Sequence, residues 1–319
     1  MNPVRTPRLP ALSVVIPTRN TRELTLACLQ SLHDHAVPGI EVVVVDDAGT
    51  DDTPEAVSRA FPSVRVLRSP EASGFTVTAN RGMAAASGEV ILLLNSDTEV
   101  LERSLDALLA AFEDGRMGVA GALLSYPDGS DQWSGGSEPG LLWLFVQASG
   151  LGPLLGRLPL RRRPSRRAGG SAAPRTVDWV TGAALAVSRR ALDQVGPLDE
   201  RFVFYAQDLD FCLRVRDAGW AVRIVPRCRI VHHHGYSISG TRATVRSQQL
   251  ELLWRDLLFW AEKQHGADWQ RRARRALAYG AGLRVLGRTL ATPVMLPLAG
   301  SGWRQSTAAC RRALRALRG

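Results

Sequence analysis

The sequence of 319 residues has few cysteines, a single lysine and no long hydrophobic run. Lys263 follows a glutamate, so the glycine-lysine pair of a phosphate-binding P-loop is missing. The four cysteines are far apart and form no CxxC pair, which argues against a zinc site and against a disulfide framework. No apolar run reaches the roughly 20 residues of a membrane span, and the proline-containing start from Met1 to Pro10 lacks the apolar core of a secretory signal. We therefore expect a reduced, cytoplasmic protein.

The chain is basic, with 40 Lys and Arg against 30 Asp and Glu and a formal net charge of +10. Such a charge is compatible with a binding module for nucleic acid or anionic surfaces. However, the arginines do not alternate with aromatic residues in a base-stacking pattern, so we expect no nucleic-acid partner. No acidic residue follows Asp268, and Trp303–Arg318 carries an apolar stripe beside several arginines. This predicts peripheral contact of the basic C-terminal helices with the inner face of the plasma membrane, the alternative being ordinary helix packing.

Apolar runs alternate with helix-like segments in the first part of the chain. Continuous runs of Val, Ile and Leu are typical of strands buried on both faces of a parallel sheet. Four such runs occur, at Leu12–Ile16, Glu41–Val45, Val64–Leu67 and Val90–Leu94. Amphipathic segments follow them at Glu23–His33, Pro54–Phe61, Val77–Ala86 and Leu101–Phe112. The pattern predicts an α/β fold, with a Rossmann-like, mostly parallel sheet flanked by helices.

The remaining chain differs in character. Residues 126–176 are rich in Gly, Pro and Ser and contain the basic run Arg161–Arg167. This composition predicts a long surface loop or mobile segment over 126–176, with its mobile basic part near 150–176. From Leu250 to Ala261 the apolar residues follow helical spacing, so the last 75 or so residues are expected to be a helical extension. We divide the chain into 1–125 as an α/β half, 126–240 as a second half and 241–319 as a helical region.

Two of the apolar runs end in carboxylates. Asp46 and Asp47 follow the second run, and Asp97 follows the fourth. Ligands of parallel sheets bind beyond the carboxyl ends of the strands, and acids gathered there repel one another unless a cation or a donor lies between them. Mg²⁺ bound to a diphosphate meets that need. The alternative is that these acids cap the helices that follow, which is at least as good a prediction for Asp47.

A second group of acids lies among aromatic residues between Asp199 and Asp210. Aromatic neighbours exclude water from a carboxylate and raise its basicity, so Asp208 is a candidate general base, with a helix cap as the alternative. Three adjacent histidines follow at 232–234. Neighbouring side chains of a strand point to opposite faces, so at most one or two of them can ligate one metal ion.

Six short motifs in a fixed order resemble family 2 of the inverting glycosyltransferases, most closely its bacterial rhamnosyltransferase-like branch. The resemblance covers about residues 12–240. The motifs are SVVIPTRN (13–20), VVVVDDAGTDDT (42–53), SGFTVTANRGMAAASGEVILLLNSDTEV (73–100), WVTGAALAVSR (179–189), VGPLDERFVFYAQDLDFCLR (195–214) and HHHGYS (232–237). The resemblance implies a GT-A fold and transfer of a sugar, with rhamnose as the favoured sugar, from a nucleotide diphosphate to a glycan or polyprenyl-linked acceptor in cell-envelope polysaccharide synthesis.

The resemblance also implies roles for individual residues. Asp208 matches the catalytic base. Asp97 matches the acid that contacts Mg²⁺ or Mn²⁺, and His232 matches a histidine that completes the metal shell in some relatives. Asp46 matches the acid that binds the pyrimidine of a dTDP- or UDP-sugar, and the resemblance adds nucleotide contacts at Pro17, Thr18, Asn20, Asn80 and Asn95. It implies acceptor contacts at Trp179, Gly182 and Gln207.

The chemistry agrees with one base and no protein nucleophile, since inversion at an anomeric carbon needs a single in-line attack, whereas a retaining hydrolase needs two close carboxylates. Three positions depart from the pattern of the branch. Ser73 replaces an asparagine, Asn95 replaces the first acid of Asp-x-Asp, and Gln207 replaces the glutamate before the base. The departures at Ser73 and Gln207 leave a second hypothesis open, an inactive GT-A-like protein that binds a partner. Hydrolysis of the donor by the purified protein would argue against it.

Overall fold

A computed structural model describes residues 11–152, 173–233 and 242–317, and the side chains of 242–249, 293–303 and 305–306 are left out of the description. The chain forms two compact units. The sheet unit comprises Met1–Ser137, Arg163–Glu200 and Gln207–Ser237, and the helical unit comprises Glu138–Arg162, Arg201–Ala206 and Ile238–Gly319. The functional division at residues 125 and 240 stays a prediction.

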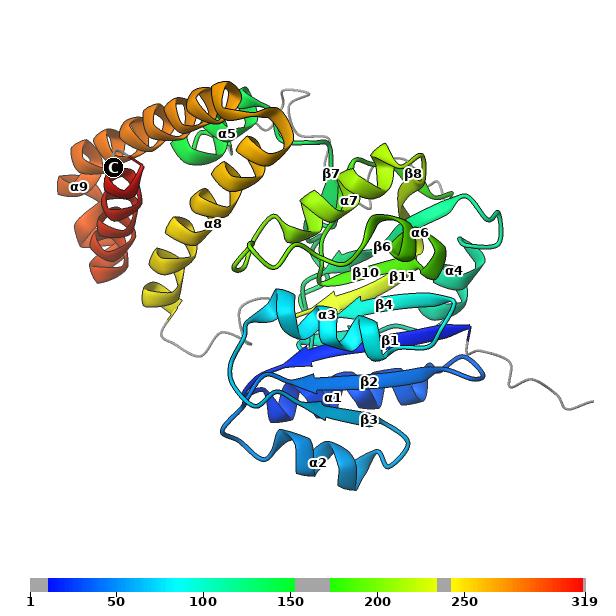
Figure 1. Cartoon of the computed structure of the whole chain (residues 1–319). Coiled ribbons are helices and arrows are strands. Elements are labelled where there is room, and N and C mark those ends of the chain that lie inside the picture. Colours follow the sequence, from blue (N-terminus) through cyan, green and yellow to red (C-terminus); the bar gives the residue numbers. More distant parts are fainter. Residues whose placement is uncertain (1–10, 153–172, 234–241, 318–319) are drawn as a thin grey trace, which may run out of the picture. The chain divides into compact units, whose positions relative to one another are not determined.

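The sheet unit is built on one large mixed sheet (Figure 1). Its main strands run in the order β3 (Arg65–Arg68), β2 (Glu41–Asp46), β1 (Leu12–Thr18), β4 (Val90–Leu94), β10 (Ala184–Ser188), β6 (Met117–Ser125), β11 (Ala221–His232) and β5 (Thr98–Val100). The short β8 (Arg175–Thr176) pairs with β11, and β7 (Gly135–Gly136) pairs separately with β9 (Trp179–Val180). The first four strands are mutually parallel, as predicted, and β10 and β5 are antiparallel to their neighbours.

Alternating side chains of the strands supply two separate cores. Val14 and Ile16 of β1 face one core, while Val15 faces the other. In β4, Leu92 belongs to the first core and Ile91 to the second. This strict alternation buries both faces of each strand, which is why the sequence shows continuous apolar runs rather than a polar-apolar pattern.

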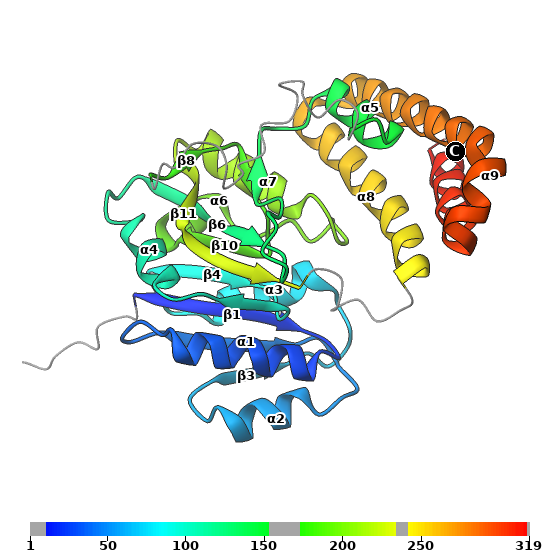
Figure 2. The ribbon, with the colours of Figure 1, turned by 180° about the vertical axis from the view of Figure 1, so that it is seen from behind.

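Helices cover both faces of the sheet. One core is closed by α1 (Arg22–Asp34), α2 (Thr53–Ala60) and α4 (Ser104–Ala110), and the other by α3 (Phe75–Ala85), α6 (Arg189–Val195) and α7 (Gln207–Asp217). Figure 1 shows α3 in front of the sheet, and Figure 2 shows α1 in front of the opposite face. The predicted helices are thus confirmed, with ends that differ by a few residues.

The helical unit contains α5 (Leu141–Ser149), α8 (Arg242–His265) and α9 (Ala267–Ala316). The prediction of a loop throughout 126–176 is therefore wrong at α5. Helix α5 packs against α9 and has no strong polar face. Gly280 of α9 lies so close to α5 that a Cβ added to it would be 2.5 Å from the carbonyl oxygen of Phe145. The basic run Arg161–Arg167 lies outside the described residues.

Helix α9 bends back on itself. A straight helix of its 50 residues would be about 75 Å long. Instead, the Arg274 guanidinium donates a hydrogen bond of 3.2 Å to the carbonyl oxygen of Leu317, and Figure 1 shows the last part of α9 beside the preceding part. Pro293 and Pro297 lie in the intervening segment, and proline removes helical hydrogen bonds and kinks a helix.

Both predicted apolar stripes of the C-terminal region are found in the helical unit. In α8, Trp254, Leu257, Leu258 and Ala261 are buried, as the spacing predicts. Thr307 and Cys310 of α9 and Leu317, which directly follows α9, are also buried. These three side chains therefore pack within the helical unit, as the alternative of ordinary helix packing predicts. The membrane contact of Trp303–Arg318 stays a prediction. The Trp303 side chain and Arg318 are not described.

Candidate functional site

The carboxyl ends of several strands meet at one edge of the sheet. Strands β1, β2 and β4 are parallel, β10 is antiparallel to both β4 and β6, and β6 is parallel to β11. Strands β1, β2, β4, β6 and β11 therefore all end at this edge, where β10 begins. The residues that follow these strands lie along the edge, which is where open α/β sheets bind their ligands.

Asp97 and His232 face each other at this edge. Both are buried, and Nε2 of His232 lies 3.2 Å from Oδ1 of Asp97. The side-chain amide nitrogen of Asn95 lies 3.4 Å from the same histidine nitrogen. Strand β5 pairs with β11, with Thr98 opposite His232, and this pairing brings residues far apart in the sequence together. The neighbouring His233 contacts Glu99 at 2.7 Å instead, and His234 lies outside the described residues, so one histidine of the three is seen at Asp97.

Gln132 fixes the orientation of the His232 ring. Its Oε1 lies 2.9 Å from Nδ1 of His232. An amide oxygen accepts a hydrogen bond, so Nδ1 carries a proton and donates it. In the neutral imidazole, the lone pair of Nε2 then points toward Asp97. Either a second proton or a cation between the two side chains would bind both this nitrogen and the carboxylate oxygen. The sequence offered no sign of this role for Gln132.

The donor set at Asp97 fits a divalent cation. It combines a carboxylate and an imidazole nitrogen, with Asn95 beside them. The side-chain oxygen of Asn95 is buried and has no hydrogen-bond partner among the described residues. Within the described parts of the chain, no group of three His, Cys, Asp or Glu side chains is placed to hold a metal ion. A cation bound here would thus take its remaining ligands from substrate phosphate and water, which is typical of Mg²⁺ sites.

Asp46 is buried at the end of β2 with one carboxylate oxygen available. Its Oδ2 accepts a hydrogen bond of 3.0 Å from the Gly49 N–H, whereas its Oδ1 is buried without a hydrogen-bond partner in the described residues. Burial raises the pKa of this carboxyl. A Cβ on Gly49 would lie 2.7 Å from Asp46 Oδ1, so a larger residue there would fill the space beside this oxygen. The atom is suited to accept a hydrogen bond from a ligand.

Asp47, by contrast, holds the start of α3. Its carboxylate accepts hydrogen bonds from the Ser73 N–H at 2.7 Å and from the Gly74 N–H at 3.0 Å. Burial alone would raise the pKa of Asp47, but these donors lower it below the ordinary value. Asp47 thus holds the residues just before α3 and does not cap α2, the helix that follows it, so the helix-capping alternative is wrong for Asp47; the hydroxyl of Ser73 also donates to it at 3.0 Å.

The loop after β1 is tied to both neighbouring loops. Asn20 has a left-handed backbone with φ of 54°, and its side-chain oxygen accepts from the Thr50 N–H at 2.6 Å. The Thr18 hydroxyl lies 2.7 Å from that of Thr21, which is 3.1 Å from the Ser96 hydroxyl. This chain of hydroxyl groups links the end of β1 to the loop that carries Asp97. Pro17 is buried in β1.

Asp208 lies at the first turn of α7. One carboxylate oxygen accepts from the Gly182 N–H at 2.9 Å and the other from the Leu209 N–H at 2.8 Å. Burial raises the pKa of Asp208, although these two donors act in the opposite direction. Ala206, two residues earlier, has a left-handed φ of 62°, an uncommon conformation for alanine that is often found at functional sites.

The turn at Gly182 connects Asp208 to the Asp97 cluster. The N–H of Asn95 donates to the carbonyl oxygen of Ala183 at 3.0 Å, and the adjacent Gly182 binds Asp208. Phe75 of α3 approaches the same place, 3.9 Å from the position that a Cβ on Gly182 would take. The structure thus brings Asn95, Gly182 and Asp208 together, and Phe75 is an aromatic neighbour that the sequence did not single out.

Comparison with known families identifies the chain. The model described as glycosyl transferase family 2 matches residues 13–196. The chain belongs to glycosyl transferase family 2. An N-acetylglucosaminyl-diphospho-decaprenol L-rhamnosyltransferase of Mycobacterium tuberculosis is 33% identical over 248 residues, which is 72% of this chain and 77% of that protein. The O-antigen biosynthesis protein RfbC of Myxococcus xanthus is 28% identical and matches 72% of this chain but only 18% of its own length.

Solved structures show the same fold. A mannosyltransferase from Pyrobaculum calidifontis, in complex with GDP-Man and Mn²⁺, matches with a TM-score of 0.60 at 19% identity, covering 98% of this chain and 87% of that one. GalNAc-T7 with UDP, GalNAc and Mn²⁺ matches with a TM-score of 0.58 at 16% identity, covering 85% and 55%. The chain is a glycosyltransferase with the GT-A fold, and the predicted rhamnosyltransferase-like branch is confirmed.

Two further residues predicted in this glycosyltransferase, Asn80 and Gln207, have different surroundings. The amide nitrogen of Asn80 donates to the carbonyl oxygen of Leu198 and to the carboxylate of Glu200, both at 2.9 Å, and its oxygen accepts from the Leu198 N–H at 3.0 Å. Asn80 therefore connects α3 to the loop between α6 and α7. Its predicted nucleotide contact stays a prediction. Gln207 is buried at the start of α7, and its side-chain oxygen has no hydrogen-bond partner in the described residues.

Trp179 forms an aromatic pair that the sequence did not predict. Its ring meets that of Trp133 edge to face, with ring centres 4.9 Å apart. The indole N–H of Trp179 donates to the carbonyl oxygen of Ser137 at 3.1 Å, and Trp133 is 41% exposed. Trp133 directly follows Gln132, the partner of His232. An exposed aromatic pair of this kind offers an apolar surface with a polar rim.

The segment that leads into α7 is held by a residue of the helical unit. Asp256 of α8 is buried, and its carboxylate accepts hydrogen bonds of 2.9 Å from the N–H groups of both Phe204 and Tyr205. Phe202 packs edge to face on Phe259 of α8, with ring centres 4.8 Å apart. The aromatic residues of this segment thus serve its attachment to α8.

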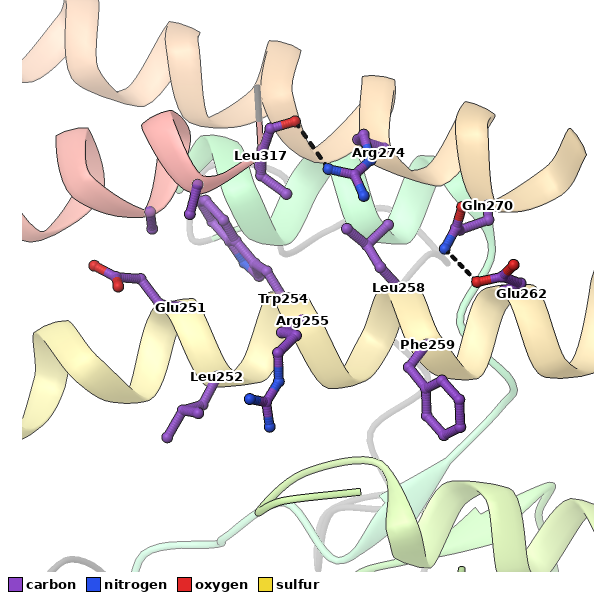
Figure 3. Close-up of a pocket in the computed structure, with 12 residues that line it drawn as sticks. Glu251, Leu252, Trp254, Arg255, Leu258, Phe259, Glu262, Gln270, Arg274 and Leu317 are labelled. Carbon is purple, nitrogen blue, oxygen red and sulfur yellow. Dashed lines mark hydrogen bonds between the residues drawn. The ribbon is translucent and has the colours of Figure 1, made fainter. Parts of the chain in front are cut away.

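A cavity of 680 Å³ lies between α8 and α9 in the helical unit (Figure 3). Trp254 and Leu258 line it together with Leu317, and Figure 3 shows a Glu262–Gln270 hydrogen bond of 2.8 Å near one end. None of the predicted catalytic, nucleotide, metal or acceptor residues lines this cavity. We therefore assign the candidate active site to the edge of the sheet.

Proposed function

We propose that the chain transfers a sugar, with inversion, from a dTDP- or UDP-sugar to a glycan or polyprenyl-linked acceptor in cell-envelope polysaccharide synthesis. In this reaction, the acceptor oxygen forms a bond to the anomeric carbon while the bond from that carbon to the diphosphate oxygen breaks. The nucleoside diphosphate leaves, and the acceptor hydroxyl loses its proton. Rhamnose is the favoured sugar because of the similarity to the mycobacterial rhamnosyltransferase.

Asp208 is the proposed base, and its environment is the single observation that carries the proposal. Its carboxylate is half-buried, has a raised pKa and is oriented by the N–H groups of Gly182 and Leu209. A carboxylate with a raised pKa accepts a proton from the acceptor hydroxyl more readily. One base is sufficient for an inverting transfer, since no enzyme-bound sugar has to be formed and broken down.

The nucleotide is proposed to bind where β1, β2 and β4 end. Oδ1 of Asp46 accepts the N–H of a uracil or thymine base, a role supported by its burial without a hydrogen-bond partner in the described residues. Asn20 holds the loop after β2 in place beside it. We assign Pro17, Thr18, Asn80 and Asn95 to the same nucleotide site as supporting or contacting residues.

A divalent cation, Mg²⁺ or Mn²⁺, is proposed to bind at Asp97 and His232, with Asn95 beside them. When bound, the cation neutralises the charge that develops on the departing diphosphate. Gln132 serves as a positioning residue, because its contact with Nδ1 keeps the Nε2 lone pair of His232 toward Asp97.

The acceptor is proposed to meet Trp179, Gly182 and Gln207, and we add Trp133 to this group. The edge-to-face pair of Trp133 and Trp179 is suited to pack against a sugar ring. The name of the mycobacterial relative specifies a lipid-linked acceptor, which leads us to propose action at the inner face of the plasma membrane. Among the described residues, no helix combines the length and hydrophobicity needed to cross a bilayer.

Substitution of the base tests this function. We expect Asp208→Asn to lower the transfer rate by at least about 10²-fold, since general-base catalysis contributes roughly 10²–10⁴. Donor binding, measured by calorimetry with Mn²⁺, should remain. Asp217→Asn is the matched control, because Asp217 is an exposed carboxylate at the other end of the same helix. Transfer by the Asp208 variant at the rate of the unmodified enzyme would remove Asp208 from the mechanism.

A further inference from the structure

Four large apolar side chains form an exposed stripe on α9. Tyr279, Leu283, Leu286 and Leu290 have exposed fractions of 73%, 43%, 56% and 71%. Their spacing of four, three and four residues places them on one face of the helix. Isolated exposed leucines are common on protein surfaces, but a contiguous apolar stripe of three turns marks a surface that contacts something else.

The rotation of α9 within the helical unit is fixed by its opposite face. Ala273, Leu277 and Ala281 are buried. Gly280 lies directly against α5, where an added Cβ would come within 2.9 Å of the Ala148 side chain. The stripe therefore cannot turn inward without breaking this packing, and its exposure is a stable property of the helical unit.

The stripe lies in the most basic part of the chain. From Trp269 to Gly319 the sequence has eleven arginines and no lysine, aspartate or glutamate. Arg272 and Arg275 are exposed and lie seven and four residues before Tyr279, so they extend the same helix face. Arg304 and Arg315 are also exposed. The stripe thus combines an apolar centre with positive charge at one end.

We propose that this face of α9, defined by Tyr279, Leu283, Leu286 and Leu290 with Arg272 and Arg275, docks the protein on an anionic lipid bilayer. The apolar side chains enter the boundary between headgroups and acyl chains, and the arginines pair with lipid phosphates. A helix with an apolar stripe and adjacent cationic residues is the typical design of an interfacial membrane helix.

The charge of the segment favours an anionic bilayer over a second copy of the chain or a nucleic acid. A second copy of the chain seated on the stripe would bring two segments of eleven arginines together, and the ion pairs of Arg271 with Asp268 and of Arg312 with Glu251 offset only part of this charge. A nucleic acid would satisfy the arginines but leave three leucines in contact with water or phosphate. An anionic bilayer satisfies both the apolar and the cationic residues.

The inference rests on the proposed action at a membrane-bound acceptor, but it concerns another surface than the sugar-transfer site. It also revises the location of the predicted membrane contact. The contact moves from the stripe of Trp303–Arg318, where Thr307, Cys310 and Leu317 are buried, to the exposed stripe in the first half of α9.

Vesicle flotation of the full chain tests the proposal. We expect at least 10-fold more protein to float with vesicles of phosphatidylglycerol and phosphatidylcholine than with phosphatidylcholine alone. The double variant Leu283→Glu with Leu286→Glu should lose at least 10-fold of this binding. Leu142→Glu is the matched control, since Leu142 is 53% exposed on α5 of the same unit, and it should float like the unmodified protein.

Three outcomes would overturn the proposal. The first is unchanged flotation of the double variant, and the second is an equal loss of flotation in the Leu142 variant. The third is a double variant that changes from dimer to monomer in light scattering while its flotation is unaffected, which would assign the stripe to contact with a second copy of the chain. Circular dichroism establishes that each variant is folded. Calorimetry with UDP and dTDP in the absence of lipid separates this proposal from the transfer function, because the stripe variants should bind nucleotide like the unmodified protein.

Discussion

At the scale of the residue, the environment decides what each carboxylate can do. Asp46 and Asp47 are adjacent in the sequence, yet burial raises the pKa of Asp46, whereas hydrogen bonds from Ser73 and Gly74 outweigh burial and lower the pKa of Asp47. Asp47 has its oxygens filled by backbone donors and serves the fold. Asp46 and Asp208 retain raised pKa values, which is more typical of residues that bind or react.

The raised pKa of Asp208 predicts the acidic limb of the pH profile. Asp208 accepts a proton only when it is ionised, so kcat/KM should fall as the pH falls through its pKa. Because burial raises that pKa, the fall should be centred above the value of about 3.9 for an ordinary aspartate. Initial rates between pH 4 and pH 8, with circular dichroism at each pH, measure this. A rate that stays constant down to about pH 4 in a folded protein would contradict the assignment.

At the scale of the element, the sequence specified the strands and most helices of the sheet unit. The apolar runs of β1, β2 and β4 and the amphipathic segments between them have clear periodicities, and their ends carry Asp46 and Asp97. Helix α5 was missed because it is apolar on most sides and lies in a region rich in Gly and Pro. Local sequence does not report that α9 covers it.

Only the residues of the site that lie in recognisable sequence motifs could be predicted. Asp46, Asp97, Asp208 and His232 each follow a strand or start a helix within a recognisable pattern. The contacts of Gln132 with His232 and of Trp133 with Trp179 join residues 100 and 46 positions apart. Such pairs depend on the register of strands that are distant in the sequence, and no local pattern encodes them.

The segment before α7 gives a prediction at this scale. The N–H groups of Phe204 and Tyr205 both donate to the same carboxylate oxygen of Asp256. Asp256→Asn keeps one acceptor oxygen but loses the negative charge, so it should weaken both hydrogen bonds and lower the free energy of unfolding by about 1 kcal/mol. We also expect a lower kcat, because this segment leads directly to Asp208. Chemical denaturation and initial rates measure the two effects.

Asp268→Asn supplies the matched control for this prediction, since Asp268 is an exposed carboxylate at the start of α9. It should change the free energy of unfolding by less than about 0.5 kcal/mol. If the Asp256 variant is as stable and as active as the Asp268 variant, then the attachment of residues 204–205 to α8 has no role in positioning the base.

At the scale of the whole molecule, the chain divides its tasks between two units. The sheet unit carries the residues proposed for donor, cation and base, and the helical unit carries the exposed α9 stripe proposed for the membrane. The glycosyl transferase family 2 model matches residues 13–196, most of which belong to the sheet unit. Loss of membrane docking should therefore leave nucleotide binding intact, while loss of Asp97 should leave docking intact.

The most direct test of the central claim is calorimetry of UDP and dTDP binding with and without Mn²⁺, for the unmodified enzyme and for Asp97→Ala. Asp131→Ala is the control, an acid close in sequence to Gln132 that has no proposed role in cation binding. We predict that Mn²⁺ strengthens nucleotide binding at least 10-fold in the unmodified enzyme and in the Asp131 variant, and that Asp97→Ala abolishes this gain. An equal gain from Mn²⁺ in the Asp97 variant would contradict a cation-bridged diphosphate at the edge of the sheet.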